Sequence, residues 1–198
     1  MATRSGTLSV VAKTPSLNDF GLVIAYLIPG LAGLWGASYV APEVRPWFGT
    51  AGTGASVGGV LLLTLAAVAA GMVASTVRWL LLDPLLRRTG VRRPERDFSR
   101  LTAHAGAFEL LIDAHYRYYQ HYGNMAVALA WVLLARRLAA GSGVVPLDRL
   151  DVALAAVAVL YLLGARDALA KYYARTGALL RRNTRRRLPR GGASGKEQ

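Results

Sequence analysis

The sequence predicts an all-helical membrane protein with four transmembrane helices. First, 54% of its 198 residues are hydrophobic, and the mean hydropathy is +0.32. Second, the apolar residues are concentrated in segments almost free of charge, as expected of polypeptide solvated by lipid. Third, the basic residues that give a net charge of +13 lie outside those segments. We expect spans at about 20–41, 57–80, 118–136 and 150–167.

The first predicted span carries no charge between Asp19 and Glu43. A helix needs about 20 apolar residues to cross a hydrocarbon core of roughly 30 Å, and this segment has that length. It is longer than the apolar region of a signal peptide, roughly 7 to 15 residues, and Pro42 follows it. We therefore expect it to remain as an anchor, preceded by a flexible cytoplasmic lead over 1–18.

Small residues recur at every fourth position of the first two spans, which permits close approach of another helix. Pro29 lies mid-span, removes one backbone hydrogen bond and should bend the helix. A broken helix can also form a substrate site in transporters. Because no charged side chain is nearby, we favour a kinked packing helix. The predicted packing positions are Gly21, Ala25, Pro29, Gly33 and Ala37 in the first span and Ala67, Gly71 and Ser75 in the second.

The second span ends in Arg78 and Trp79. An arginine at the end of a span can extend its head group to the interface, and tryptophan favours the same level. We expect these two side chains to mark the water boundary. A basic connection and an amphipathic helix should then occupy 84–117.

The amphipathic helix has Asp97 or Ser99 as its predicted N-cap and runs without a breaker into the third span. Its spacing predicts an ion pair between Asp113 and Arg117. An apolar and aromatic stripe suits contact with acyl chains or with a neighbouring helix. That stripe comprises Phe108, Ile112, His115, Tyr119 and Tyr122.

The third and fourth spans are short. Residues 123–135 reach only about 20 Å at 1.5 Å per residue, so the span should begin at Tyr118, with the neighbouring tyrosines at headgroup level. The fourth has 14 uncharged residues, 152–165. A re-entrant hairpin is the alternative. It would bring Arg136, Arg137 and Arg149 to bilayer depth at about 2.5 to 3.5 kcal/mol each, so we favour crossing.

Basic residues are unevenly divided between the two sides. With four crossings, 20 of the 24 lie on the side of both termini and four lie opposite, at Arg45, Arg136, Arg137 and Arg149. The positive-inside rule therefore places both termini in the cytoplasm. We expect a multi-pass protein of a bacterial inner membrane, with a membrane domain over 19–170 and a basic tail over 171–198.

The sequence lacks most motifs that are typical of catalytic or cofactor-binding sites. The chain has no cysteine, no phosphate-binding glycine loop, no serine nucleophile elbow and no paired-histidine zinc helix. Acids, bases and histidines are absent from the cores of the spans, which argues against a coupled transporter. Glu109 and Asp113 share a helix face and could act on a lipid headgroup. His115 lies about 200° from Asp113, so one helix cannot bring both to one metal. We expect no metal and no cofactor.

The favoured function is a non-enzymatic membrane component that presents a basic cytoplasmic surface to anionic lipids or to a cytosolic partner protein. The first alternative is an oligomeric pore packed through Gly33, Ala37, Gly71 and Ser75. The second is a headgroup-modifying enzyme. Only the positive net charge would favour nucleic-acid binding, so we do not expect nucleic acid as a partner. The predicted contact residues are Arg87, Arg88, Arg92, Arg93, Arg96, Tyr118, Tyr119, Tyr122, Arg181, Arg182, Arg185, Arg186 and Arg187.

Overall fold

The computed structural model describes residues 17–48, 57–141 and 146–180. These residues are almost entirely helical and include no strand, so the all-helical prediction is confirmed. The predicted lead and the tail arginines Arg181, Arg182, Arg185, Arg186 and Arg187 lie outside the described part. The long elements are α1 (Leu17–Val40), α2 (Val57–Val77), α5 (Arg117–Ala139) and α6 (Arg149–Leu179).

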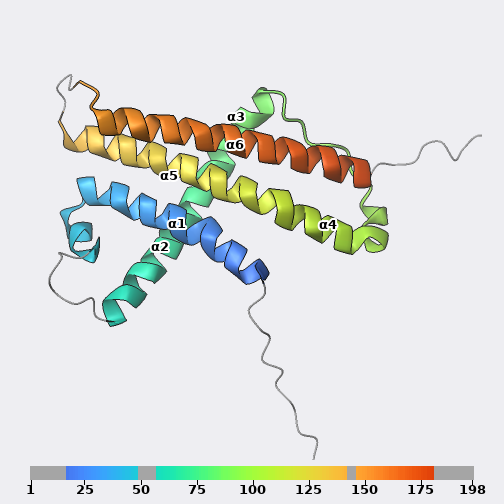
Figure 1. Cartoon of the computed structure of the whole chain (residues 1–198), viewed down its shortest axis with the longest axis horizontal. Coiled ribbons are helices and arrows are strands. Elements are labelled where there is room, and N and C mark those ends of the chain that lie inside the picture. The colour runs from blue at the N-terminus through green and yellow to red at the C-terminus, as the bar shows by residue number, and fades with distance from the viewer. Residues whose placement is uncertain (1–16, 49–56, 142–145, 181–198) are drawn as a thin grey trace, which may run out of the picture.

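Three of the long helices form a layer, and the fourth crosses it (Figure 1). In that layer α5 lies between α1 and α6 and contacts both. Helices α1 and α5 run toward the same end, where the short helix η1 (Pro42–Phe48) and the connection to α6 lie; α6 runs back. We call this end the hairpin end. Helix α2 crosses the layer obliquely and packs mainly on α1.

Two helices continue beyond the apolar segments from which they were predicted. α2 leads through a π-helical turn, η2 (Arg78–Leu82), into α3 (Asp83–Arg88). Helix α4 (Ala105–Leu111) leads through a second π turn, η5 (Ile112–Tyr116), into α5. The predicted helical run is therefore continuous from Ala105 to Ala139, but it begins later than predicted, because Asp97 caps the separate short helix η3 (Phe98–Arg100). Each π turn inserts a residue into the helical repeat, and such turns often occur at functional sites.

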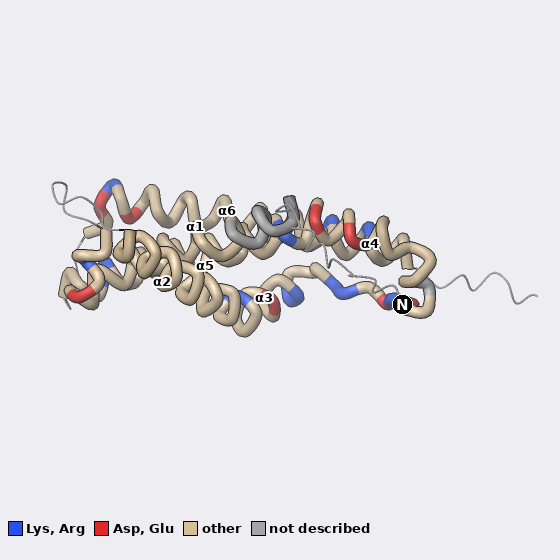
Figure 2. Tube along the Cα trace, turned by 90° about the horizontal axis from the view of Figure 1, so that it is seen from below, with Lys and Arg blue, Asp and Glu red and all other residues tan. Residues whose placement is uncertain are grey.

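Two of the described helices are long and apolar enough to cross a membrane. They are Val57–Arg88, with 32 residues, and Arg149–Leu179, with 31 residues. Within the most apolar 18 residues of each helix, only 17% and 22% are buried inside the chain, so both helices expose an apolar surface. α1 contains a further apolar helical segment, Ile24–Val40. Figure 2 shows charged residues at the hairpin end and throughout the half of the molecule that holds α3 and α4, with an uncharged stretch between the two groups.

Helices α1 and α2 touch through glycine. A Cβ at Gly30 would lie 1.6 Å from the carbonyl oxygen of Ala67, and one at Gly71 would lie 2.0 Å from that of Tyr26. Backbone therefore meets backbone, as in close-packed membrane helices. Of the predicted packing positions, Ala25, Pro29, Ala67 and Gly71 are buried, Gly33, Ala37 and Ser75 are half-buried, and the surroundings of Gly21 lie outside the described part.

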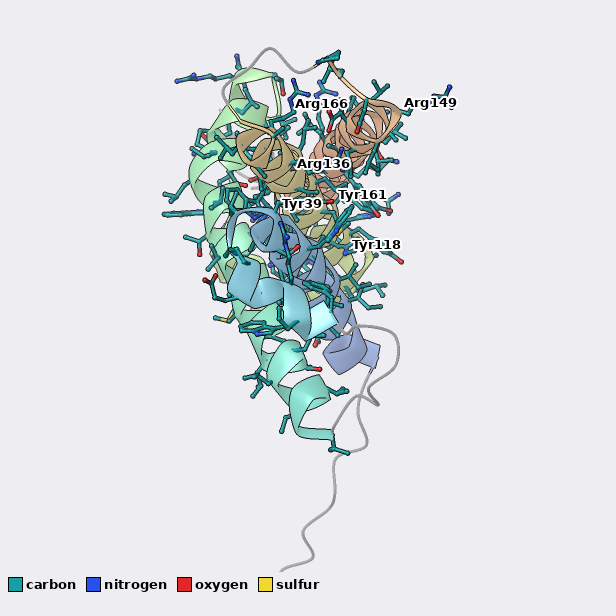
Figure 3. The ribbon with its side chains drawn as sticks, turned by 90° about the vertical axis from the view of Figure 1, so that its left-hand side faces the viewer. Tyr39, Tyr118, Arg136, Arg149, Tyr161 and Arg166 are labelled. Carbon is teal, nitrogen blue, oxygen red and sulfur yellow. The ribbon has the colours of Figure 1, made fainter. Side chains whose placement is uncertain are left out.

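The hairpin end is closed by ion pairs. Asp148 caps α6 in a capping box with Asp151, and Arg136 lies 2.7 Å from Asp148 and 3.2 Å from Asp151. Arg137 adds a contact of 3.1 Å to Asp151. The guanidinium of Arg136 also lies 5.6 Å from the ring centre of Tyr39 on α1, as Figure 3 shows from this end. These contacts join α1, α5 and α6.

Candidate functional site

A chain of buried polar groups begins at the proline of α1. Pro29 has no N–H, so it leaves the carbonyl oxygen of Ala25, four residues earlier, without its usual helical donor. The side-chain nitrogen Nδ2 of Asn124 donates to that oxygen at 3.0 Å. Asn124 lies on α5 and is 0% exposed. A polar side chain of one helix thus replaces the bond that proline removes from another, as apolar surroundings require.

The second member of the chain is Arg78. Its Nε donates to Oδ1 of Asn124 at 3.1 Å, and the residue is 4% exposed. Gly123 provides the space, because a Cβ there would lie 2.5 Å from Cδ of Arg78. The expectation that Arg78 extends toward the water boundary is therefore wrong. Its position at the start of η2 directs the side chain into the interior, and only Trp79 beside it is exposed.

The chain ends at a carboxylate. Nη1 of Arg78 lies 3.5 Å from Oδ1 of Asp83, and the hydroxyl of Tyr119 donates to the same oxygen. The guanidinium carbon of Arg78 is also 4.7 Å from the ring centre of Tyr119, a cation–π contact. One positive and one negative group thus balance each other, and the buried charge has the partners it needs. We call Arg78, Asp83, Tyr119 and Asn124 the polar chain.

The polar chain joins elements that are far apart in sequence. It connects α1, the α2–η2–α3 helix and α5 at the level where the second helix changes from α to π geometry. An ionisable group inside a membrane domain is by default a functional hypothesis. The hydrogen-bonding partners of Arg78 lie within the chain, so the polar chain can fix how the three helices pack against one another. Sequence reasoning missed it, although Asn124 and Gly123 in an otherwise apolar run were an available signal.

The predicted basic contact residues divide into two groups. Arg87 and Arg88 on α3 and Arg92 and Arg93 in the following segment are exposed. Arg96 is half-buried, and its Nη2 donates to Oγ1 of Thr176 on α6 at 2.9 Å.

The guanidinium of Arg96 also lies over two rings of α6, 5.1 Å from the centre of Tyr172 and 5.5 Å from that of Tyr173. Its role in the structure is to hold the segment against α6. The four exposed arginines, Arg87, Arg88, Arg92 and Arg93, are called the basic surface below.

The three predicted contact tyrosines have different surroundings. Tyr118 is 54% exposed, whereas Tyr119 is 1% exposed and belongs to the polar chain. Tyr122 packs 5.9 Å from the ring of Tyr161, and its ring atoms approach Gly164. Ile112, Tyr116 and Tyr122 pack on a core formed with α6. Tyr119 and Tyr122 of the aromatic stripe therefore pack against a neighbouring helix, α6, which is one of the two contacts that the spacing suits.

The two acidic candidates have different surroundings. Arg117 lies 2.8 Å from Asp113, which confirms the predicted ion pair, and Glu109 is exposed. Within the described ranges no group of three side chains could hold a metal ion.

Comparison with known proteins adds no assignment: no protein family, no curated protein and no solved structure matches the chain.

Proposed function

We propose that the chain is a four-span membrane protein with both termini in the cytoplasm, and that its basic surface binds anionic phospholipid headgroups. Two helices long and apolar enough to cross support the membrane part of this proposal. Helices α1 and α5 run in one direction and α6 runs back, as the first, third and fourth of four crossings must, which supports the shorter crossings. The hairpin end then lies outside the cytoplasm, with few basic residues.

The observation that carries the binding proposal is where the four exposed arginines lie. They follow directly on a helix that exposes Trp79, Leu81 and Leu85, so the cations come immediately after an apolar surface. In a bilayer this level holds the phosphate groups, and a basic residue near an anionic surface contributes about 1 kcal/mol. With Arg96 fixed against α6, the segment that carries Arg92 and Arg93 is held in place for such contact.

A cytosolic protein is the other partner that the basic surface suits. We favour lipid because the apolar side chains beside the arginines are continuous with the exposed face of α2. The aromatic stripe that a protein partner was expected to use is packed against α6.

The proposal is tested by lipid selectivity. Wild-type protein and the variant Arg87→Gln/Arg88→Gln/Arg92→Gln/Arg93→Gln are reconstituted in phosphatidylcholine bilayers containing trace spin-labelled phosphatidylglycerol or phosphatidylcholine. Electron paramagnetic resonance then measures the protein-associated fraction of each. We expect wild type to prefer phosphatidylglycerol and the variant to prefer it less, by up to about fivefold per arginine at low salt.

Arg149→Gln is the control, because Arg149 is an exposed arginine of the hairpin end. It should leave the preference unchanged. Equal selectivity in wild type and in the fourfold variant would refute the lipid proposal.

A further inference from the structure

A groove of about 640 Å³ lies between α1, α2 and α5. It begins beside the close contact of Gly30 and Gly71, where α2 diverges from α1, and α5 forms its floor. The residues that line it carry no charged group and no amide side chain. They include Gly33 and Ala37 of α1, Ala70 of α2, Leu81 of η2, and Val127 and Trp131 of α5.

The dimensions of the groove suit a hydrocarbon chain. Along α2 and η2 its lining runs from Ala70 to Leu81, which is about 16 Å at 1.5 Å per residue. One acyl chain spans about the same length, half of a roughly 30 Å hydrocarbon core.

The lining of the groove presents apolar atoms. The indole N–H of Trp131 donates to the carbonyl oxygen of Gly33 at 3.1 Å, so the polar atom of this side chain already has a partner and its ring lines the groove. Gly33 leaves the space open, since a Cβ there would meet only Cβ of Ala70, at 4.0 Å. The groove also opens beside Val73 of α2 and Leu81 of η2, both largely exposed.

A cation lies next to one end of the groove. Nε of Arg45 donates to the carbonyl oxygen of Ser38 at 2.9 Å, and Ser38 directly follows the groove-lining Ala37. Arg45 itself is exposed, so its terminal nitrogens face solvent or headgroups. Trp47 and Phe48, partly exposed on the same short helix, are residues typical of the interface level. An acyl chain in the groove would bring its phosphate to this guanidinium.

We infer that the groove holds one acyl chain of an anionic phospholipid, with its phosphate at Arg45. This site is separate from the basic surface and lies toward the hairpin end. The inference rests on the membrane placement proposed above, but it does not depend on lipid binding by Arg87, Arg88, Arg92 and Arg93.

The test uses the fluorescence of Trp131. A variant that keeps this tryptophan alone, with Trp35, Trp47 and Trp79 changed to phenylalanine, is placed in bilayers containing a small fraction of phosphatidylglycerol brominated in its acyl chain. We expect brominated phosphatidylglycerol to quench Trp131 strongly. Brominated phosphatidylcholine at the same fraction should quench it less. In this background Gly33→Leu fills the groove and should abolish the excess quenching.

Two further variants locate the effect. Gly58→Leu is the matched control, because nothing lies within 4 Å of a Cβ at Gly58. The fluorescence of Trp131 in this variant should be quenched as much as in the parent. Arg45→Gln should remove the preference for phosphatidylglycerol while quenching by phosphatidylcholine remains.

Equal quenching of the parent and Gly33→Leu would overturn the groove assignment, and equal quenching of the parent by both lipids would overturn the role of Arg45. A dimer that excludes brominated lipid from Trp131 would also overturn the inference. The spin-label result for the basic surface is independent of all three outcomes, so either proposal can fail alone.

Discussion

Replacing Asn124 by leucine, which has nearly the same shape, tests the polar chain. The change removes the donor to the Ala25 carbonyl oxygen and the acceptor of the Arg78 Nε. A neutral hydrogen bond contributes about 1 kcal/mol, and one to a charged group about 1.5 to 3 kcal/mol. Hydrogen bonds between membrane helices average only about 0.6 kcal/mol, so the neutral bond belongs at the low end. We expect a loss of about 2 to 4 kcal/mol.

The assay is unfolding in mixed micelles by sodium dodecyl sulfate, followed by far-ultraviolet circular dichroism. Gln120→Leu, which removes another amide from the same helix, is the control and should cost much less, since Gln120 is only half-buried. A loss below about 0.5 kcal/mol for Asn124→Leu would refute the assignment of a buried network.

A double-mutant cycle identifies the proline as the cause. Pro29→Ala restores a backbone N–H that can bond the carbonyl oxygen of Ala25. In that background Asn124→Leu should cost about 1 kcal/mol less than in wild type, because the donor it removes is no longer needed. Strictly additive effects would mean that Asn124 does not compensate for Pro29.

Two other contacts give sharp expectations. Gly30→Ala should destabilise by about 1 to 3 kcal/mol or more, because its Cβ would fall 1.6 Å from the oxygen of Ala67 and the helices must separate; Gly58→Ala should be nearly neutral by the same unfolding assay. Arg136→Gln and Asp151→Asn, whose side chains lie 3.2 Å apart, should show a coupling of about 1 kcal/mol in a double-mutant cycle, and zero coupling would remove the ion pair from the account.

Much of the fold follows from local pattern. The charge-free segments locate the long helices, and the absence of a breaker predicts that the amphipathic helix and α5 are continuous, which the structure shows from Ala105 to Ala139. The Asp113–Arg117 pair follows from helical spacing alone. Such features depend on neighbours within one turn.

The polar chain depends instead on tertiary contact. Position in sequence places Arg78 at the end of an apolar run, where extension toward water is usual. The side chain turns inward because Gly123 leaves space for it and Asn124 accepts its Nε, 46 residues away in sequence. The proline at position 29 predicts that the carbonyl oxygen of Ala25 lacks its helical donor, but it does not predict which residue supplies another donor.

The same limit applies to the tyrosines. Spacing places Tyr119 and Tyr122 on one stripe, but it does not decide whether lipid, a partner or α6 covers that stripe. In the structure α6 covers it, because Tyr161, Gly164 and Tyr172 pack against it.

The central claim is that the chain crosses a membrane four times and leaves its basic surface inside, and cysteine labelling tests it directly because the chain has no native cysteine. Single cysteines replace Trp47 or Arg149 at the hairpin end and Thr89 or Arg92 in the basic segment, and intact cells are treated with a membrane-impermeant maleimide. We expect labelling of the first pair in intact cells and of the second pair only after permeabilisation. Equal labelling of both pairs in intact cells, or protection of both, would contradict the four-span account.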